Sequence, residues 1–148
     1  MVRRVLAVDV GARRVGLAIS DASGTLARPL ETIVVARDDD AVDRVARRVV
    51  ALSAEDDGLA TIVVGLPVHL DGTPSAESAR VRAFVARLAT MTKVPIAVED
   101  ERLTSREAES RLAARERDWR KRKRKLDAAA AAIILQDYLD RTGSPGPD

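Results

Sequence analysis

The segment that most restricts the fold is the run TIVVGL at residues 61–66, in which almost every side chain is apolar. Successive side chains of a strand point to opposite faces of a sheet, so a strand that is apolar throughout is buried on both faces. Strands of this kind lie in the centre of parallel sheets that helices cover on each side. Residues 5–10, VLAVDV, form a second such run with one acidic residue inside it. The two runs predict an α/β domain.

Periodicity in the remaining sequence predicts the other strands and the helices. A turn joins the first strand to a returning strand, so the chain opens with a hairpin. Apolar residues at i, i+3 and i+4 indicate helices between the later strands, which favours a mixed five-stranded sheet flanked by helices on both faces. The expected strands are residues 5–10, 15–20, 29–35, 61–66 and 95–98, and the expected helices are residues 41–52, residues 81–89, one opened by Thr104 and Glu107, and one that starts near Asp127.

Length and composition are those of a single domain. A chain of 148 residues with 46% hydrophobic content buries about 70% of its unfolded surface on folding. We expect one domain at residues 1–141 and a disordered tail at residues 142–148. The chain has no cysteine, which excludes disulfides and cysteine nucleophiles and fits the cytoplasm. Charged residues interrupt the N-terminal region before a secretory or membrane segment can form, so we expect no contact with a membrane.

Positive charge is concentrated in one segment. Residues 115–125, RERDWRKRKRK, hold eight basic and two acidic side chains and so carry +6, whereas the whole chain carries +2 and the remainder therefore −4. A cationic element on a mildly acidic body fits a polyanionic partner, with nucleic acid the leading candidate. Trp119 adds a ring on which a base can stack. The alternative is a solvated charged loop, although so many neighbouring cations repel one another without a counter-surface.

Asp9 is the acidic residue inside the first apolar strand. A charged carboxylate there costs several kcal/mol of desolvation unless a cation or hydrogen-bond donors meet it. Two explanations are open, namely a functional acid or a structural Asp paired with Arg13 or Arg14 of the turn. In the predicted hairpin Asp9 lies opposite Gly16. Asp21 is then about 17 Å away along the strand and cannot share a site with Asp9.

A cluster of acids follows the strand at residues 95–98. Open α/β sheets present ligand sites at this end of their strands. Alternation places Glu99 and Glu101 on one face and Asp100 on the other. Each acid taken alone is better explained as part of a solvated strand end with Arg102 as its counter-ion, but as a cluster the acids fit a site equally well.

Asp127 stands at the expected start of the last helix. An Asp in that position is commonly an N-cap or a partner of the helix dipole and needs no other role. The five alanines at residues 128–132 allow the helix to lie close to the sheet and bring its first turn near strand ends. Asp137 and Asp140 follow about 15 to 20 Å further along the helix and belong to the surface.

Carboxylates gathered in one place need a cation. Like charges about 4 Å apart repel by about 4 kcal/mol per pair at an effective dielectric of 20, and a divalent metal removes that penalty. Two Mg²⁺ or Mn²⁺ ions held by acidic oxygens activate a water and stabilise the leaving oxygen of a phosphodiester. Such a site requires no histidine. His69, the only histidine, lies in a loop at residues 67–74 that either meets a phosphate or simply connects two elements.

Four segments together resemble the YqgF/RuvX family of bacterial RuvC-like proteins. They cover nearly the whole chain in the family's order and spacing, and they read VLAVDVGARRVGLAISD, VVGLPVHLDGTPS, VEDERLTSREAE and KLDAAAAAIILQDYL. The resemblance implies an RNase H-like fold and a cytoplasmic nuclease that acts on the 5′ end of pre-16S rRNA. Resolution of Holliday junctions has also been proposed for such proteins.

The resemblance also implies the site residues. Asp9 matches the acid of the first strand, Glu101 the acid of the DER motif and Asp127 the acid that opens the last helix, so these three are the predicted catalytic and metal-binding residues. Asp100 is a further candidate ligand. His69 stands where the family commonly has asparagine. The predicted nucleic-acid-binding residues are Arg14, His69, Trp119, Arg120, Lys121, Arg122, Lys123, Arg124 and Lys125.

The predicted function is a divalent-metal-dependent endonuclease of ribosomal RNA maturation, either a monomer or a homodimer, with Mg²⁺ or Mn²⁺ as cofactor. A Holliday junction resolvase is the alternative within the same reaction class. A non-catalytic RNA-binding assembly factor that uses only the basic segment is a second alternative. The motif DVGARRVG is also similar to the phosphate loop of actin-like ATPases, but those enzymes close two related domains around a nucleotide and this chain supplies one.

Overall fold

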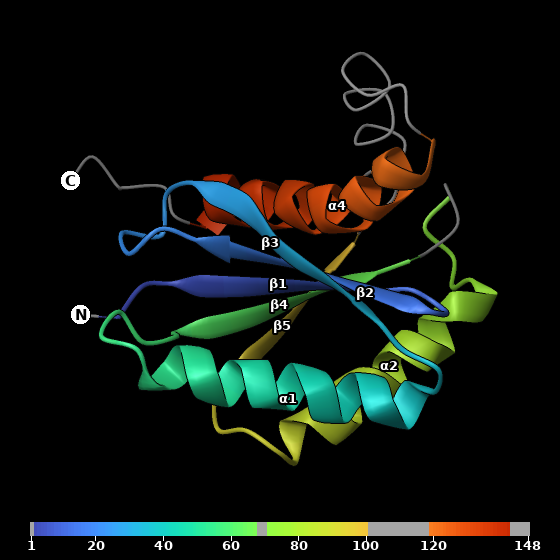
Figure 1. Cartoon of the computed structure of the whole chain (residues 1–148), viewed down its shortest axis with the longest axis horizontal. Coiled ribbons are helices and arrows are strands. Elements are labelled where there is room, and N and C mark those ends of the chain that lie inside the picture. The colour runs from blue at the N-terminus through green and yellow to red at the C-terminus, as the bar shows by residue number, and fades with distance from the viewer. Residues whose placement is uncertain (1, 68–70, 101–118, 143–148) are drawn as a thin grey trace.

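A mixed five-stranded sheet forms the centre of the molecule, with helices on both of its faces (Figure 1). The structure is a computed structural model that describes residues 2–67, 71–100 and 119–142, apart from the side chains of residues 38, 39 and 119–127. The strands follow the order β3-β2-β1-β4-β5. They are β1 (Val5–Val10), β2 (Arg14–Ser20), β3 (Ala27–Val34), β4 (Thr61–Leu66) and β5 (Ile96–Asp100), and the helices are α1 (Asp38–Ala54), α2 (Ala76–Ala89) and α4 (Trp119–Thr142).

The two faces of the sheet have separate cores, and β1 contributes to both. It pairs antiparallel with β2 and parallel with β4, as its apolar sequence predicts for a central strand. Leu6 and Val8 pack with α1 and α2 on one face, whereas Val5 and Ala7 pack with α4 on the other. The predicted mixed sheet with helices on both faces is confirmed. Because side chains alternate along a strand, Asp9 belongs to the face that α4 covers.

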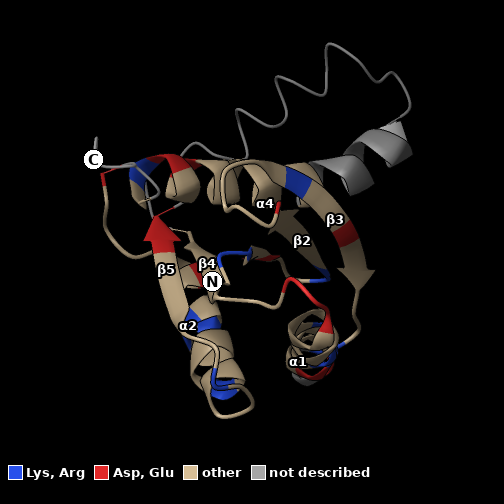
Figure 2. Ribbon diagram, turned by 90° about the vertical axis from the view of Figure 1, so that its left-hand side faces the viewer, with Lys and Arg blue, Asp and Glu red and all other residues tan. Residues whose placement is uncertain are grey.

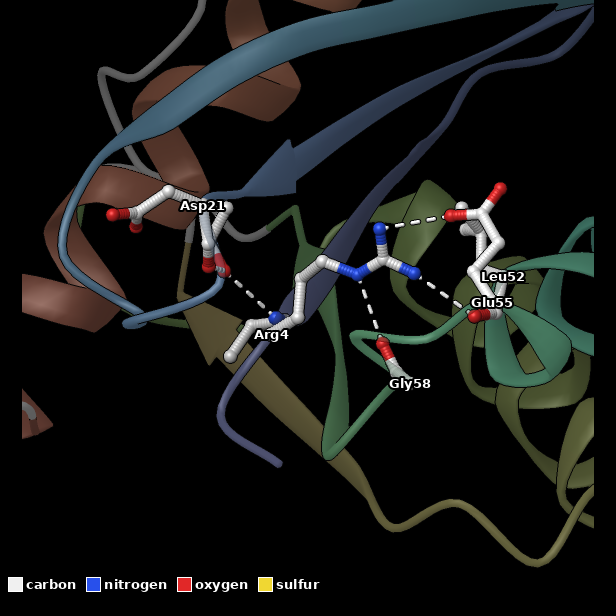
Figure 3. A network of polar contacts seen from close by, with 7 residues as sticks. Arg4, Asp21, Leu52, Glu55 and Gly58 are labelled. Atoms are coloured by element: carbon white, nitrogen blue, oxygen red, sulfur yellow. Dashed lines mark hydrogen bonds and ion pairs between the residues drawn. The ribbon is translucent and has the colours of Figure 1, made fainter. Parts of the chain in front are cut away.

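Arg4 ties the segment before β1 to the end of α1 (Figure 3). Its Nε donates to the carbonyl of Gly58 at 2.8 Å, and its Nη2 donates to the carbonyl of Leu52 at 2.9 Å. Its Nη1 lies 2.9 Å from Oε1 of Glu55. The last turn of α1 has no basic residue of its own. Arg4 therefore supplies the cation and the donors that the carbonyl end of a helix requires.

The last helix begins at Trp119 and not near Asp127, so the predicted start is wrong by two turns. The basic segment has no apolar stripe, and periodicity therefore gives no helical signal there. Arg and Lys are nevertheless strong helix formers, and neither proline nor glycine occurs between residues 119 and 142. Asp127 consequently lies in the third turn of α4. The structural explanation of Asp127 as an N-cap is excluded, because capping and dipole effects are confined to the first turn.

The alanine-rich part of α4 lies on the sheet, as its small side chains predict. Ala131, Ile134, Leu135 and Leu139 are buried against strand residues of that face. Gln136 adds a polar anchor, since its Oε1 accepts from the amide of Ala27 at 2.9 Å and its Nε2 donates to the carbonyl of Thr25 at 3.0 Å. The helix is thus fixed at the β3 edge of the sheet by hydrogen bonds as well as by packing.

Some predictions fall on residues that the structure does not describe. These are the helix opened by Thr104 and Glu107, the loop residue His69, and residues 143–148 of the expected tail. Helix α4 continues through Thr142, and the division into a domain at residues 1–141 and a tail stays a prediction. Within the described ranges, no helix has both the length and the apolar character that a membrane span requires.

Candidate active site

The hairpin that opens the chain places Asp9 as predicted, directly opposite Gly16. The amide of Gly11 donates to the carbonyl of Arg14 at 2.8 Å and closes the turn. A Cβ atom on Gly11 would lie 2.7 Å from that same carbonyl oxygen, which is closer than real Cβ atoms approach. The close approach of the backbone therefore accounts for Gly11, and no ligand needs to be invoked there.

Asp9 stands between two glycines on the face covered by α4. Gly16 is its partner on β2, and the parallel register that pairs Val8 with Val64 brings Gly65 of β4 beside it on the other side. Neither neighbour carries a side chain that could occupy the space next to the carboxylate. Asp9 itself is half-buried. The two residues next to Asp9 on the neighbouring strands thus have no side chains, an arrangement that leaves room beside the carboxylate for a cation or a phosphate.

Arg14 lies on the same face of the sheet as Asp9. It is the first residue of β2 and precedes Gly16 by two positions, so its side chain shares the face of Gly16. Diagonal neighbours of this kind on an antiparallel pair are about 7 to 8 Å apart. Arg14 is half-buried. Its position fits both a counter-ion for Asp9 and a contact to substrate phosphate, the two roles that the sequence suggests.

The acids at the end of β5 are separated by strand alternation, as predicted. Glu99 pairs in register with Gly65 and is 7% exposed, whereas Asp100 is exposed on the opposite face. Both carboxylate oxygens of Glu99 accept hydrogen bonds from the guanidinium of Arg141 in the last turn of α4. These bonds and the charge of Glu99 raise the pKa of Arg141. Sequence reasoning missed this partner because it is 42 residues away.

Asp21 has a structural role that separates it from Asp9. Its carboxylate accepts from the hydroxyl of Ser23 at 2.6 Å and from the amides of Thr25 at 2.8 Å and Leu26 at 3.0 Å. These hydrogen bonds, that of Ser23 foremost, lower the pKa of Asp21 to about 2. Asp21 directly follows β2, at the end of the hairpin away from the Asp9–Gly16 pair. It organises the turn between β2 and β3.

The predicted metal site is only partly within the described structure. Among the side chains that are described, no three acids or histidines lie close enough together to hold a metal. Glu101 and His69 fall outside the described residues, and of Asp127 only the place in α4 is given. The basic residues at 120–125 likewise have a helical backbone and undescribed side chains. The metal set and the nucleic-acid contacts therefore stay predictions.

A cavity of about 260 Å³ opens on the opposite face, between α1 and α2. Val10, Val42 and Phe84 line it, and Arg80 and Arg87 stand at its polar parts. Asp9, Glu99 and Asp100, the candidate acids whose side chains the structure describes, do not contribute to this lining. The cavity is also on the face to which Leu6 and Val8 point, away from Asp9. We therefore do not assign it to the candidate active site.

Comparison with known proteins matches the chain with one family over almost its full length. The family model RuvX, described as Holliday junction resolvase, matches residues 3–141. A protein of Anaeromyxobacter dehalogenans strain 2CP-1 is 44% identical over 138 residues, which are 93% of this chain and 97% of that protein. A protein of Chloroflexus aggregans is 40% identical over 141 residues, 95% of this chain and 96% of that protein. Both carry the name "Putative pre-16S rRNA nuclease".

Solved structures of RuvC share the fold. Thermus thermophilus RuvC in complex with a Holliday junction substrate superposes with a TM-score of 0.57 at 16% identity, over 95% of this chain and 96% of that one. A second structure of Thermus thermophilus RuvC gives a TM-score of 0.53 at 17% identity over the same shares. The likeness confirms the predicted RNase H-like fold. Together with the family model and the two relatives, it leads to the conclusion that the chain belongs to the RuvX family.

Proposed function

We propose that this chain is a divalent-metal-dependent endonuclease that hydrolyses phosphodiester bonds and processes the 5′ end of pre-16S rRNA. The observation that carries the proposal is Asp9, a half-buried carboxylate in an apolar strand with a glycine on each side. A carboxylate in an apolar strand is costly unless cations or hydrogen-bond donors meet it, and a bound metal ion is one such cation. The names of the two relatives support RNA as the substrate.

The proposed metal ligands are Asp9, Glu101 and Asp127. Within the acidic cluster Glu99 is engaged by Arg141 and Asp100 lies on the other face, which favours Glu101. Asp127 is not needed as a helix cap, because α4 begins at Trp119. It also precedes by one turn the buried Ala131 that packs on the face of Asp9. These observations support a functional role for both acids.

The proposed ligands suit Mg²⁺ or Mn²⁺, because carboxylate oxygens are the donors that these hard cations prefer. When bound, the metal activates a water and stabilises the leaving oxygen of the phosphodiester. Asp9 contributes a negative charge at a position between two glycines of the neighbouring strands. Arg14, on the same face, orients a substrate phosphate through its guanidinium. The absence of cysteine supports our further proposal of a cytoplasmic location.

A Holliday junction resolvase is the second candidate function. The description of the matching family and the fold shared with junction-bound RuvC favour it. A resolvase that cuts two strands symmetrically requires a two-fold dimer, whereas an RNA processor can act as a monomer. Sedimentation velocity at the concentration used for cleavage distinguishes these two states. A stable dimer favours the resolvase, and a monomer that retains cleavage favours RNA processing.

A cleavage panel tests the proposed function. The substrates are a 5′-extended 16S precursor RNA and a four-way DNA junction, each incubated with Mg²⁺, with Mn²⁺ or with excess EDTA. We expect metal-dependent cleavage of the RNA that EDTA abolishes, and slower cleavage of the junction. Preferential cleavage of the junction would contradict RNA processing and favour Holliday junction resolution as the function. Cleavage that persists in EDTA would contradict a metal-dependent mechanism.

The basic segment predicts a strong salt dependence of RNA binding. Changing residues 121–124 to glutamine removes four positive charges, and each lost phosphate contact lowers the slope of log affinity against log salt by about 0.7 to 0.9. We therefore expect the slope to fall by up to about 3 units. Fluorescence anisotropy from 50 to 300 mM KCl measures it. The matched control changes four exposed arginines of α1 and α2 to glutamine, namely Arg44, Arg47, Arg82 and Arg87.

The two variants together locate the RNA-binding surface. A slope that falls only in the variant of residues 121–124 places RNA on the basic segment. Equal losses in both variants would indicate that RNA responds only to the overall charge. An unchanged slope in the first variant would remove the basic segment from the interface.

A further inference from the structure

The ion pair between Glu99 and Arg141 connects β5, the strand that precedes Glu101 in the chain, with α4, the helix that contains Asp127. Glu99 lies in β5, two residues before Glu101, and Arg141 lies in α4, the helix that contains Asp127. In Figure 2 the end of β5 points toward α4, and the side chains of Glu99 and Arg141 bridge the two elements. Both oxygens of the carboxylate accept hydrogen bonds from the guanidinium, so the ion pair is bidentate.

The environment of Glu99 argues against a role as a metal ligand. Glu99 is 7% exposed and lies in the same row as Asp9 and Gly65 on the sheet. Both of its oxygens face a guanidinium, and a cation would have to displace Arg141 to reach them. The row spacing puts the Cα atoms of Asp9 and Glu99 about 10 Å apart, two strands from each other. The Glu99 carboxylate therefore lies beside the proposed site but is bound by Arg141.

We propose that Glu99 is a positioning residue, whose pair with Arg141 sets α4, and with it Asp127, against the end of β5, the strand that Glu101 follows in the sequence. The inference rests on the proposed metal-dependent function. A helix is a rigid rod with a rise of about 1.5 Å per residue, so a shift at Arg141 is transmitted to Asp127 about 21 Å away. Misplacement by about 1 Å at a reacting centre costs about a hundredfold in rate.

A second attachment of α4 to the sheet keeps the helix docked when the Glu99–Arg141 ion pair is lost. Gln136 already ties α4 to the start of β3, at the opposite edge of the sheet from β5. Loss of the Glu99–Arg141 contact consequently leaves α4 docked but free to pivot about its other attachment. The side chain of Arg141 is 60% exposed, so Glu99→Gln leaves a solvated cation behind and the fold intact.

The test measures Mn²⁺ binding without substrate, through the electron paramagnetic resonance signal of free Mn²⁺. We expect Glu99→Gln to weaken Mn²⁺ binding by about 10- to 100-fold, the usual cost of losing a residue that orients metal ligands. Glu31→Gln is the matched control, because Glu31 pairs with Arg48 at 2.6 Å in a strand-to-helix ion pair on the other side of the sheet. It should bind Mn²⁺ like the unmodified chain.

Arg141→Gln decides between positioning and direct ligation. If Glu99 positions α4, this variant weakens Mn²⁺ binding as Glu99→Gln does. If Glu99 is instead a ligand held back by Arg141, its release strengthens Mn²⁺ binding, which would overturn the proposal. Unchanged binding in both variants would overturn it as well. The proposed function has a separate test, since Asp9→Asn must weaken Mn²⁺ binding whatever Glu99 does.

Discussion

Asp9→Asn is expected to lower the single-turnover rate of RNA cleavage by at least about a thousandfold, or about 4 kcal/mol of transition-state stabilisation. Asparagine has the shape of aspartate but lacks the charge that holds a divalent cation. The two glycines beside Asp9 carry no side chain that could take over this role. The fold should tolerate the change, because a neutral amide is cheaper than a carboxylate in a half-buried position of an apolar strand.

The measurement combines single-turnover cleavage at saturating Mn²⁺ with a thermal unfolding curve for each variant. Asp57→Asn is a suitable control, since Asp57 is an exposed carboxylate in the turn after α1. We expect the control to keep its rate and both variants to keep their melting temperature within a few degrees. Cleavage by Asp9→Asn at the original rate would mean that the catalytic centre lies elsewhere. Full function of Asp9→Asn in cells would instead favour the non-catalytic assembly factor.

The sheet could be predicted from the sequence because its signals are local. Residues 5–10 and 61–66 are apolar at nearly every position, which only a strand buried on both faces explains. The short turn fixes the hairpin register, so the pairing of Asp9 with Gly16 followed directly. The start of α4 could not be predicted in this way. Its first two turns are basic on all sides, and their helical state depends on residue propensity and not on an apolar stripe.

The contacts around the candidate site join residues far apart in the chain, and sequence patterns do not predict them. Glu99 has Arg102 close by in sequence, but its partner is Arg141 on another element. The packing of α4 across the sheet creates that pair, and no spacing rule encodes it. Asp127 shows the same limit, because a capping role requires the helix to start there and α4 starts at Trp119. The sequence is sufficient to predict the candidate acids. It is not sufficient to predict the residues with which they pair.

Arg4→Met is expected to lower the free energy of unfolding by about 3 kcal/mol, and hence the melting temperature by about 6 to 12 °C for a chain of this size. Arg4 is 8% exposed, and its guanidinium bonds the carbonyls of Leu52 and Gly58. A hydrogen bond from a charged donor contributes about 1.5 to 3 kcal/mol, and this substitution removes two of them. The carbonyl of Gly58 loses the Arg4 donor, whereas the carbonyl of Leu52 keeps the amide of Glu55 at 3.2 Å. Methionine keeps the apolar part of the side chain, so the loss reports on the hydrogen bonds.

The ion pair with Glu55 should contribute much less than the two carbonyls. Glu55 is 56% exposed, and an ion pair with so exposed a partner is worth under about 1 kcal/mol. Glu55→Gln should therefore unfold within a few degrees of the unmodified chain, as should Arg3→Met, which changes the exposed neighbour of Arg4. A loss of stability in Glu55→Gln equal to that in Arg4→Met would assign the stabilisation to charge pairing instead.

Arg4→Met should also separate stability from activity. Because Arg4 lies at the end of β1 away from Asp9, Arg4→Met should retain the cleavage rate well below its melting temperature. This is the reverse of the outcome expected for Asp9→Asn.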